Sequence, residues 1–459
     1  MKKLVLVNPV NPARIGLTIN KSSRFPPIGL GIIAGLTPAS WEIKLIDENW
    51  ETFTYQEADL VGITAFTASA NRAYEIASLY RQHGVPVIMG GIHASMCPDE
   101  ASQFVNAIVI GEAETVWPEV VADFEAGCLQ KKYNGAWSDL KGMPCPRRDL
   151  FHAEYMFASV QTSRGCPMDC EFCSVTAYNG RRYRRRPAEE VLDELESIPQ
   201  KMIFFVDDNI IGYGQSSREQ ALAIFKGMVQ RKLHKWWFCQ ASLNFGDDEE
   251  VLRWASLAGC KMVFLGLESD EIDALKEMHK QLNLQRGIDS YDKAFSKIQQ
   301  AGIAVLGAFI FGNEGDTVEK LKKRVNYIMH HSGIDIMQTT FLTPLPGTRL
   351  FDRYQSEGRL LYTNYPQDWE HYDMTEVIFS PGCLESVQLQ QTMESLNRQM
   401  YTVPVLLRKA FNTLCQTRSM TAAMFAWNSN RNYRNVSRNI SKPIYINEPA
   451  VKSFIIPIF

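Results

Sequence analysis

The sequence lacks the features that mark membrane, secreted and general nucleic-acid-binding proteins. No apolar run approaches the ~20 residues needed to span a bilayer. Lys and Arg (48) nearly balance Asp and Glu (51), and a formal net charge of −3 gives no general nucleic-acid signature. The N-terminal Met-Lys-Lys-Leu-Val-Leu-Val is too short for a signal peptide and predicts a strand. We therefore expect a cytoplasmic protein without a membrane span or a nucleic-acid partner.

Most cysteines lack the paired spacing of a disulfide framework or a second metal cluster. A disulfide framework is also implausible in a chain of 459 residues without a secretory signal. These cysteines are read as small buried hydrophobes. They are Cys97, Cys128, Cys145, Cys239, Cys260, Cys383 and Cys415.

Three other cysteines stand within eight residues, in Arg-Gly-Cys-Pro-Met-Asp-Cys-Glu-Phe-Cys. Cys166, Cys170 and Cys173 have gaps of three and two residues. Three thiolates on one loop can hold three irons of a [4Fe–4S] cluster and leave the fourth iron open. The alternatives are ordinary buried cysteines or half of a zinc site, but no Cys or His lies close enough downstream to complete a finger-like set.

This motif resembles that of the radical S-adenosylmethionine enzymes. The resemblance implies that Cys166, Cys170 and Cys173 are metal ligands and catalytic. It implies that S-adenosylmethionine binds the open iron through its amino and carboxylate groups and is cleaved to a 5′-deoxyadenosyl radical. An electron donor such as ferredoxin or flavodoxin is implied as well. The cofactor performs this chemistry while the protein positions and shields it.

Residues 1–130 alternate strand-like and helix-like segments, which predicts an α/β domain with a doubly wound, Rossmann-like parallel sheet. Ligands of such sheets bind beyond the carboxyl ends of the strands. The expected strands are Lys3–Val7, Glu42–Ile46, Leu60–Thr64, Val85–Met89 and Ala107–Ile110. The expected helices are Ile28–Leu36, Ala70–Gln82, Asp99–Phe104 and Glu114–Phe124.

Two strand-end loops stand out, Gly90-Gly91-Ile92-His93 and Gly111-Glu112-Ala113-Glu114. Together with Val61-Gly62-Ile63-Thr64 and Pro98-Asp99-Glu100, all ahead of the cysteines, they resemble the cobalamin-binding domain of cobalamin-dependent radical enzymes. The resemblance covers the first third of the chain. It implies that Gly90, Gly91 and His93 flank the nucleotide tail and that Thr64 to Ser69 face the lower side of the corrinoid. Gly111 and Glu112 are assigned to the same cofactor.

The chain departs from the better-known cobalamin pattern at the histidine that binds cobalt. It has no Asp-x-His-x-x-Gly string, and Asp47-Glu48-Asn49 occupies the nearest comparable loop. His93 is one alternative cobalt ligand. It is otherwise a loop histidine that hydrogen-bonds the cofactor or the backbone, so the lower ligand is left open.

After a connection rich in Pro and charge, βα alternation resumes and continues to about residue 346. Six strands predict a partial (β/α)6 TIM-like barrel rather than the closed eight-stranded form. They are expected at Ser159–Ser163, Met202–Val206, Trp236–Ala241, Met262–Leu267, Ala304–Phe311 and Ile336–Phe341.

Polar groups recur where these strands end, the usual place for site residues of such barrels. Any one of them could merely cap the next helix. The family resemblance implies that the following residues contact S-adenosylmethionine: Asp207 and Asp208 at the methionyl end, Gln240, Glu268 at the sugar, and Phe172, Phe309 and Gly312 near adenine. Thr343 to Arg349 forms a rigid closing turn, because two prolines fix φ and Gly347 permits a tight bend.

The basic run from Arg181 to Arg186 follows the cysteine loop directly. It is either a solvated face or a site that neutralises phosphates or a substrate carboxylate. A second basic stretch, Arg418 to Arg438, is expected to be solvated surface or a pairing site within a C-terminal cap.

From Leu350 the pattern changes to helices, with Leu384–Tyr401 and Val403–Thr413 at helical spacing. A mainly helical cap would exclude water from a radical. We therefore predict three domains: a cobalamin-binding domain (1–140), a radical core (141–350) and a helical substrate-side domain (351–459).

The leading hypothesis is a cobalamin-dependent radical methyltransferase that moves a methyl group from methylcobalamin to an unactivated carbon of a small molecule, lipid or peptide side chain. The same family includes enzymes that cyclise or rearrange a substrate without methylating it. The transfer-RNA methylthiotransferases fit poorly, because they carry three cluster cysteines in the first domain and this one offers Cys97 and Cys128. A non-catalytic cobalamin-binding sensor or partner protein would not need Cys166, Cys170 and Cys173.

Overall fold

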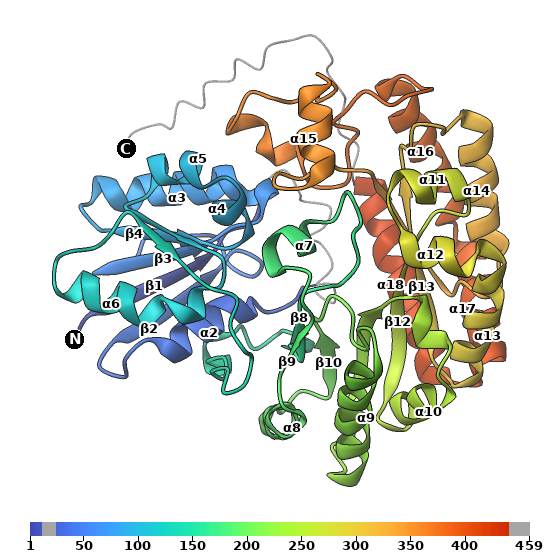
Figure 1. Cartoon of the computed structure of the whole chain (residues 1–459), viewed down its shortest axis with the longest axis horizontal. Helices are drawn as coiled ribbons and strands as arrows, with labels where there is room; N and C mark the ends of the chain where they lie inside the picture. Colours follow the sequence, from blue (N-terminus) through green and yellow to red (C-terminus); the bar gives the residue numbers. More distant parts are fainter. Residues whose placement is uncertain (12–23, 440–459) are drawn as a thin grey trace.

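The structure is a computed structural model that describes residues 1–11 and 24–439. It contains two six-stranded parallel sheets that face each other, each covered by helices (Figure 1). The first sheet lies in the N-terminal part, and the second lies in the middle of the chain beside the C-terminal helices. Among the described residues, no helix is long and apolar enough to cross a bilayer.

The first sheet has the strand order β2-β1-β3-β4-β5-β6, with every pair parallel. Connections leave β1 in opposite directions, which creates a switch point between β1 and β3. The strands are β1 (Lys3–Asn8), β2 (Glu42–Asp47), β3 (Leu60–Thr64), β4 (Val87–Gly90), β5 (Ala107–Ile110) and β6 (Lys132–Asn134). Its helices are α2 (Ile28–Leu36), α3 (Ala70–Gln82), α4 (Ile92–Met96), α5 (Pro98–Phe104) and α6 (Trp117–Glu125).

The second sheet has the order β14-β13-β12-β11-β10-β7. Strands adjacent in sequence are adjacent in space and parallel, as in an open barrel of six βα units. The strands are β7 (Phe157–Val160), β10 (Met202–Phe205), β11 (Trp236–Ala241), β12 (Cys260–Glu268), β13 (Ala304–Phe311) and β14 (Ile336–Phe341). A short antiparallel pair, β8 (Ser163–Arg164) with β9 (Arg184–Arg185), brackets the cysteine loop.

The helices of the barrel region are α7 to α15. Most of them lie on the outer face of the sheet (Figure 1). They are α7 (Ser174–Asn179), α8 (Ala188–Ser197), α9 (Gln215–Gln230), α10 (Glu249–Leu257), α11 (Ile272–Glu277), α12 (Gln281–Arg286), α13 (Tyr291–Gln300), α14 (Val318–His330) and α15 (Arg349–Ser356).

The predicted fold class is confirmed: a doubly wound N-terminal sheet, a six-stranded partial barrel and a mainly helical C-terminal part. Most element bounds agree within one or two residues, and β11, β13 and β14 agree throughout. The short edge strand β6 and helix α4 were not predicted. The domain limits at 140 and 350 stay predictions.

The C-terminal part forms α16 (Ser386–Met400), α17 (Val403–Thr417) and α18 (Met420–Asn439). Helix α18 packs on β12, β13 and β14. Its Ala422, Phe425 and Ala426 are buried in one cluster with Phe157 and Phe238 of the barrel. The prediction of solvated surface for Arg418–Arg438 was therefore wrong, because this stretch has an apolar face that fills the inner side of the sheet.

The C-terminal part also contacts the first domain directly. Asn71 donates a hydrogen bond of 2.8 Å to the carbonyl of Gln367, and Trp369 donates to both oxygens of Glu100 at 3.0 Å. The indole of Trp369 is buried and stacks on Tyr365, with ring centroids 3.8 Å apart. These contacts hold the first sheet opposite the barrel.

Candidate functional site

A cavity of about 370 Å³ lies beyond the carboxyl ends of β3, β4 and β5, and we call it the glycine-lined cavity. Gly62, Gly90, Gly91 and Gly111 line it. This is the crevice where doubly wound sheets bind ligands. The glycines singled out in the first-domain motifs of the sequence all lie here.

Two of these glycines are required by the backbone. Gly91 has φ +90°, and a Cβ atom there would lie 2.6 Å from Oγ1 of Thr64. Gly111 has φ +75°, and its Cβ would lie 2.6 Å from the carbonyl oxygen of Gly135. Only glycine adopts this conformation without strain and leaves the backbone accessible. The cavity is therefore shaped by missing side chains, which suits a large cofactor tail.

A larger cavity of about 800 Å³, the central cavity, separates the first domain from the inner face of the barrel. Thr64 and Ser69 line it from the first domain, and Gln240 lines it from the barrel. Its barrel wall is mainly apolar and includes four aromatic side chains, Phe157, Phe204, Phe238 and Phe264. The two cavities share five lining residues: Ile28, Gly29, Leu30, Thr64 and Phe66.

The joined cavities fit a corrinoid with its nucleotide tail. A Cβ at Gly29, which lines both, would meet no atom within 4 Å, so the space continues past the backbone. Phe66 is 72% exposed in this space, although it is a large apolar side chain. No histidine is among the described residues that line either cavity.

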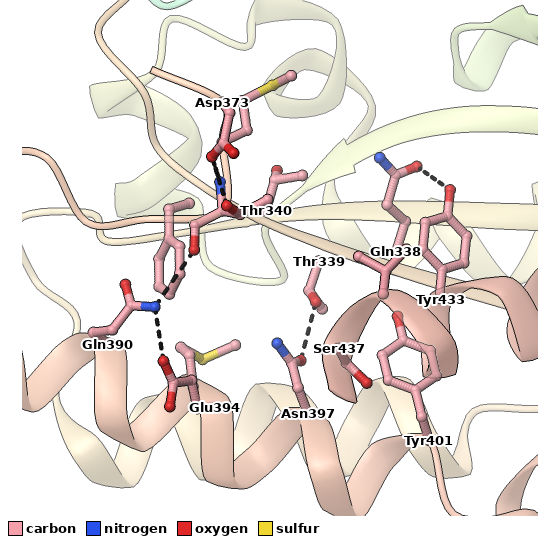
Figure 2. A pocket seen from close by; sticks show the side chains of 15 residues that line it. Gln338, Thr339, Thr340, Asp373, Gln390, Glu394, Asn397, Tyr401, Tyr433 and Ser437 are labelled. Atoms are coloured by element: carbon pink, nitrogen blue, oxygen red, sulfur yellow. Dashed lines mark hydrogen bonds between the residues drawn. The ribbon is translucent and has the colours of Figure 1, made fainter. Parts of the chain in front are cut away.

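A third hollow of about 180 Å³, the side chamber, opens between β14, α16 and α18 (Figure 2). Gln338, Tyr433 and Val436 line both the side chamber and the central cavity. The chamber therefore adjoins the place where substrate and cofactor would meet.

The three cysteines lie on the loop between β8 and α7, held on both sides by the fold. Gly165, with φ +88°, precedes Cys166, and the carboxylate of Glu171 pairs with Arg353 of α15 at 2.9 and 3.0 Å. Arg349 donates to the carbonyl of Asp169 at 2.7 Å. The closing turn and α15 therefore fix the conformation of the loop.

The chemistry of the loop suits an iron–sulfur cluster. Burial raises the pKa of all three thiols, that of Cys173 to about 12, and the Lys280 ammonium lowers it in each case. Within the described residues, no three His, Cys, Asp or Glu side chains converge closely enough to share a single metal ion. A cube gives each thiolate its own iron, so the three sulfurs need no common centre.

Lys280 is a site residue that the sequence did not indicate. Its Nζ donates to Oε1 of Glu268 at 2.7 Å, and the Lys280 side chain is 14% exposed. Glu268 ends β12 with φ +63°, in the left-handed region that is uncommon for a residue with a side chain. The pair places one positive and one negative charge beside the cysteines, where an amino acid group could be bound.

The two neighbouring aspartates have different surroundings. Asp207 is fully buried, and its Oδ1 accepts hydrogen bonds from the backbone and side chains of Thr162 and Ser163. Burial raises its pKa to about 6 despite these bonds. After burial, the charge of Asp208 is the next effect that raises the pKa of the Cys166 thiol, and Asp208 accepts a hydrogen bond from Asn179 at 3.2 Å. Asp207 thus positions the start of the cysteine segment, while Asp208 faces it.

The residues expected near adenine are not all accessible. Phe309 is fully buried in the main core, and Gly312 lies under Phe379, whose ring would be 2.9 Å from an added Cβ. Phe172 is partly buried against the same core. The structure therefore assigns the side chain of Phe309 to packing, while its backbone runs in register with Glu268.

His93 is turned away from both cavities. Its ring is completely buried, and Nε2 lies 2.9 Å from the Tyr74 hydroxyl and 3.2 Å from Glu100. Trp369 packs edge-on against it. Helix α4 directs the ring into the contact with the C-terminal part, so this side chain lines neither cavity, and its place beside a nucleotide tail stays a prediction.

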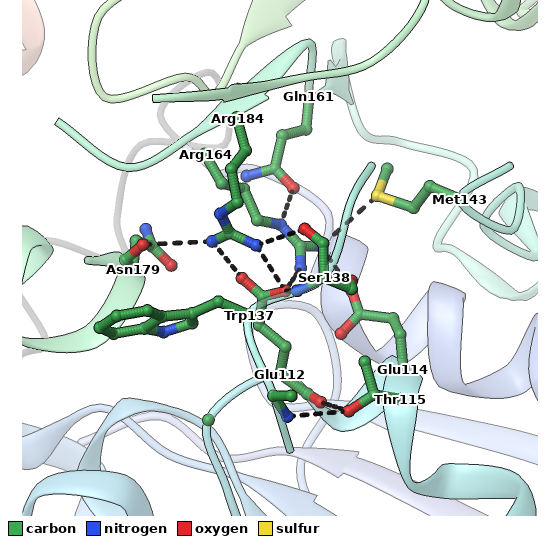
Figure 3. A network of polar contacts seen from close by, with 12 residues as sticks. Glu112, Glu114, Thr115, Trp137, Ser138, Met143, Gln161, Arg164, Asn179 and Arg184 are labelled. Carbon is green, nitrogen blue, oxygen red and sulfur yellow. Dashed lines mark hydrogen bonds and ion pairs between the residues drawn. The ribbon is translucent and has the colours of Figure 1, made fainter. Parts of the chain in front are cut away.

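Glu112 lines the glycine-lined cavity, but its carboxylate is held by arginines of the barrel (Figure 3). It accepts from both terminal nitrogens of Arg184, one at 2.8 Å, and lies 3.4 Å from Arg164. Arg164 also pairs with Glu114. Burial opposes ionisation, but the Arg184 hydrogen bond leads the effects that lower the pKa of Glu112. This network joins the first domain to the cysteine segment.

Ion pairs within the protein also explain the basic run from Arg181 to Arg186. Arg184 binds Glu112, and Arg186 is buried and pairs with Glu194 of α8. Arg181 pairs with Asp169 at 3.4 Å and is exposed. A solvated face and a site for phosphates or a substrate carboxylate were both wrong for Arg184 and Arg186, because carboxylates of the protein itself neutralise these two side chains.

Comparison with known proteins agrees with this division. Residues 16–121 match the B12 binding domain family, and residues 160–328 match the Radical SAM superfamily. The bacteriochlorophyllide d C-12(1)-methyltransferase of Chlorobaculum tepidum is 27% identical over 430 residues, 89% of each chain. The hopanoid C-2 methylase of Rhodopseudomonas palustris is 29% identical over 354 residues, 73% of this chain and 66% of the relative.

Solved structures share the whole architecture. The methyltransferase TsrM from Kitasatospora setae, with cobalamin and a [4Fe–4S] cluster bound, has a TM-score of 0.69 at 16% identity and covers 95% of this chain and 98% of its own. The cobalamin-dependent enzyme OxsB, with aqua-cobalamin and S-adenosylmethionine bound, also has a TM-score of 0.69, at 13% identity over 95% and 79% of the two chains. On these matches and on the site geometry, the chain belongs to the cobalamin-dependent radical S-adenosylmethionine enzymes, which use a [4Fe–4S] cluster, S-adenosylmethionine and cobalamin.

Proposed function

We propose that this protein is a radical S-adenosylmethionine C-methyltransferase that transfers a methyl group to an unactivated carbon. Several of its relatives are named as methyltransferases or methylases. The acceptor would lie in the central cavity, between the first domain and the barrel.

One observation carries the proposal: segments on both sides of the cysteine loop form part of the wall of the glycine-lined cavity. Arg164 lies two residues before Cys166, and Tyr178 lies five residues after Cys173; both line this cavity together with Gly91 and Gly111. Tyr178 also donates a hydrogen bond of 3.2 Å to the carbonyl of Gly111. Holding the two reaction centres together in this way supplies the proximity that a two-cofactor reaction needs.

When bound, the cluster and S-adenosylmethionine supply the deoxyadenosyl radical, and the corrinoid supplies the methyl group. The chain's own residues hold and shield them. Cys166, Cys170 and Cys173 would hold the cluster, Lys280 would pair with the carboxylate of the methionine moiety, and Glu268, which Lys280 holds in place, would meet the sugar. The aromatic barrel wall would exclude water from the radical.

The experiment is anaerobic reconstitution with iron, sulfide and cobalamin, followed by absorption and electron paramagnetic resonance spectra. Turnover with S-adenosylmethionine should give both 5′-deoxyadenosine and S-adenosylhomocysteine. Cluster formation without retention of cobalamin would contradict the assignment of the first domain.

Cyclisation or rearrangement is the second candidate, because a magnesium-protoporphyrin IX monomethyl ester cyclase of Rubrivivax gelatinosus is 23% identical over 438 residues. Both reactions form 5′-deoxyadenosine. Formation of S-adenosylhomocysteine distinguishes methyl transfer.

We further propose a cytoplasmic enzyme that receives electrons from a ferredoxin or flavodoxin and does not bind nucleic acid. All ten cysteines are without a disulfide bond in the structure, the state expected in a reducing compartment. Reduction by purified ferredoxin or flavodoxin, followed by the yield of 5′-deoxyadenosine, tests the donor.

A further inference from the structure

Helix α17 is inverted relative to an ordinary surface helix, which turns its apolar face inward. Three of its four buried residues are polar: Lys409, Thr413 and Thr417. Val403, Leu407 and Phe411 are exposed instead, and Phe411 is 66% exposed. Their spacing of four residues places these three side chains in one line along the helix. The outward face of α17 is therefore the apolar one.

Hydrogen bonds of the buried face fix this orientation. The Lys409 ammonium donates to three backbone carbonyls at 2.6–2.8 Å, those of Ile328, His331 and Ile334. The Thr413 hydroxyl donates to the buried carboxyl group of Asp335 at 2.8 Å. Turning the apolar face inward would break these bonds and leave buried polar groups unsatisfied, which is costly. The exposed line of apolar side chains is therefore a fixed part of the surface.

The next helix adds to this apolar surface. Two residues separate α17 from α18, and α18 packs along α17, so that the two form a hairpin, the α17–α18 hairpin (residues 403–439). Met420 and Met424, one helical turn apart at the start of α18, are both more than half exposed. Figure 1 shows α17 on the far side of the barrel from the first domain. Exposed apolar side chains gathered in this way mark a surface that binds a partner or a membrane.

The charge of the hairpin is of one sign. The sequence has no Asp or Glu between Glu394 and Glu448, whereas residues 400–439 contain one lysine and five arginines. Arg431 and Arg438 are exposed, and they follow Met424 by seven and fourteen residues, so they lie on the same face of α18. Helix α13, which packs on α17, adds two lysines and one aspartate. The exposed apolar side chains are thus accompanied by positive charge.

We infer that the α17–α18 hairpin binds the surface of a membrane that contains anionic lipid. Apolar side chains would enter the headgroup region, and the arginines beside them would meet lipid phosphates. A second copy of the chain fits this face poorly, because it would bring like charges together. The inference does not depend on which reaction the protein catalyses.

Membrane binding would also bring the lipid close to the reaction site. Tyr433 of α18 lines the central cavity, and it lies nine residues after Met424, which is half a turn around the helix. One face of α18 is therefore turned to the cavity and the opposite face to the exposed surface. A bound membrane would lie about one helix diameter, roughly 10 Å, from the central cavity.

The test is sedimentation of the full chain with lipid vesicles of two compositions. One contains equal parts of phosphatidylglycerol and phosphatidylcholine, and the other contains phosphatidylcholine alone. We expect the anionic vesicles to bind at least about tenfold more tightly and to lose this advantage as salt is added, since the arginines attract the anionic surface. Equal binding to both compositions, or binding to neither, would overturn the inference.

Matched variants locate the binding on the hairpin. Phe411→Ser and Leu407→Ser should each weaken binding to the anionic vesicles by about tenfold, because each removes apolar area that enters the headgroup region. Ile272→Ser is the control and should change nothing: Ile272 is 54% exposed, against 55% for Leu407, but lies on α11 between Glu271 and Asp273.

Charge reversal tests the second part of the surface. Arg431→Glu should weaken binding to the anionic vesicles severalfold. Lys131→Glu, at an exposed lysine beside the edge strand β6 of the first domain, should leave it unchanged. Equal effects of the two reversals would place the lipid contact elsewhere and contradict the inference.

Circular dichroism and urea unfolding show that each variant is folded before its binding is measured. If Phe411→Ser and Leu407→Ser are folded and bind as tightly as the parent chain, the contact is purely electrostatic. An acidic protein would then be the better partner, and the inference would be wrong. Sedimentation velocity without vesicles gives the last check, since a dimer that Phe411→Ser dissociates would show that a second copy covers this face and would also overturn the inference.

Discussion

The two parallel sheets end in loops of opposite chemical character. At the carboxyl edge of the first sheet, glycines such as Gly91 and Gly111 expose backbone to a cavity, and Glu112 is already neutralised by arginines. At the carboxyl edge of the barrel sheet, ionisable side chains gather, with Asp208, Glu268 and Lys280 near the cysteines. The first sheet edge offers space and exposed backbone, and the second offers charge and sulfur.

The contrast between the two sheet edges shows how one chain can offer sites for two unlike cofactors. A large cofactor tail needs room, which glycine supplies because it has no side chain. Glycine also loses more conformational entropy on folding than other residues do. A cluster and an amino acid group need fixed ligands and counter-charges. Each of the following variants changes one sheet edge and should spare the other.

The largest effect is expected at the cysteine loop. Cys170→Ala removes one cluster ligand and should abolish formation of 5′-deoxyadenosine, since the remaining thiols cannot hold the cube stably. Cobalamin binding to the first domain should persist, as measured by its absorption spectrum after gel filtration. Cys128→Ala, at an exposed cysteine of the first domain, is the control. Retention of the cluster spectrum in C170A would contradict the assignment.

The second largest effect is expected when the buried ammonium group of Lys280 is removed. Lys280→Met leaves Glu268 without its partner in a largely buried site, which costs about 3–5 kcal/mol of unfolding free energy. Urea unfolding of the apoprotein measures this. Lys276→Met, which removes a surface pair with Asp273, should cost less than about 1 kcal/mol. If both variants lost the same free energy of unfolding, the Lys280–Glu268 ion pair would behave as a surface pair, which would contradict its burial beside the cysteines.

The buried carboxyl group of Asp207, at the end of a barrel strand, should also make the free energy of unfolding depend on pH. Asp207 has its pKa raised from 3.8 to about 6 by burial, so the folded state holds a proton that the unfolded state releases between these values. The free energy of unfolding should therefore fall as pH rises from about 4 to 6, by up to about 3 kcal/mol. Asp207→Asn should flatten this slope in urea titrations of the apoprotein, and the exposed Asp273→Asn should preserve it. A slope that survives in D207N would assign the pH dependence to another group.

The smallest effect is expected at Gly111, at the carboxyl edge of the first sheet. Gly111→Ala and Gly84→Ala introduce a side chain at nearly the same φ, +75° and +74°, but only Gly111 is crowded, by the Gly135 carbonyl. In both variants the strain of the left-handed backbone should lower the free energy of unfolding by roughly 1 kcal/mol. Gly111→Ala should lower it by at least about 1 kcal/mol more. It should also weaken cobalamin retention while the cluster forms normally. Equal behaviour of the two variants would mean that the close approach at Gly111 is not needed.

Much of this arrangement could be predicted from sequence because its signals are local. Ala304–Phe311 and Ile336–Phe341 are unbroken apolar or β-prone runs, and the cysteine spacing identifies its ligand without any tertiary information. Strand-end glycines likewise announce the first cavity. Such features need only near neighbours in the chain to be recognised.

The errors arose where contacts join distant segments. Arg184 finds Glu112 across 72 residues, and Lys280 reaches cysteines more than a hundred positions earlier, so neither partner was apparent. The direction of the Phe309 ring was not apparent for a different reason, because alternate residues of a strand face opposite sides and its ring lies on the packed one. For α18 a signal was present: Ala422, Phe425 and Ala426 have the i, i+3, i+4 spacing of an apolar helix face, which the surrounding arginines and asparagines obscured.

The position of α18 against the inner wall of the barrel also has a consequence for biosynthesis. Strand β14 ends at Phe341, but the helix that covers its inner face begins at Met420. At ribosomal speeds this interval lasts roughly 4 to 16 seconds, during which the aromatic interior of the barrel has no covering helix. A nascent chain therefore holds the cluster cysteines long before it has a closed reaction chamber. The element that covers the inner face of the barrel is thus the last described element to be synthesised.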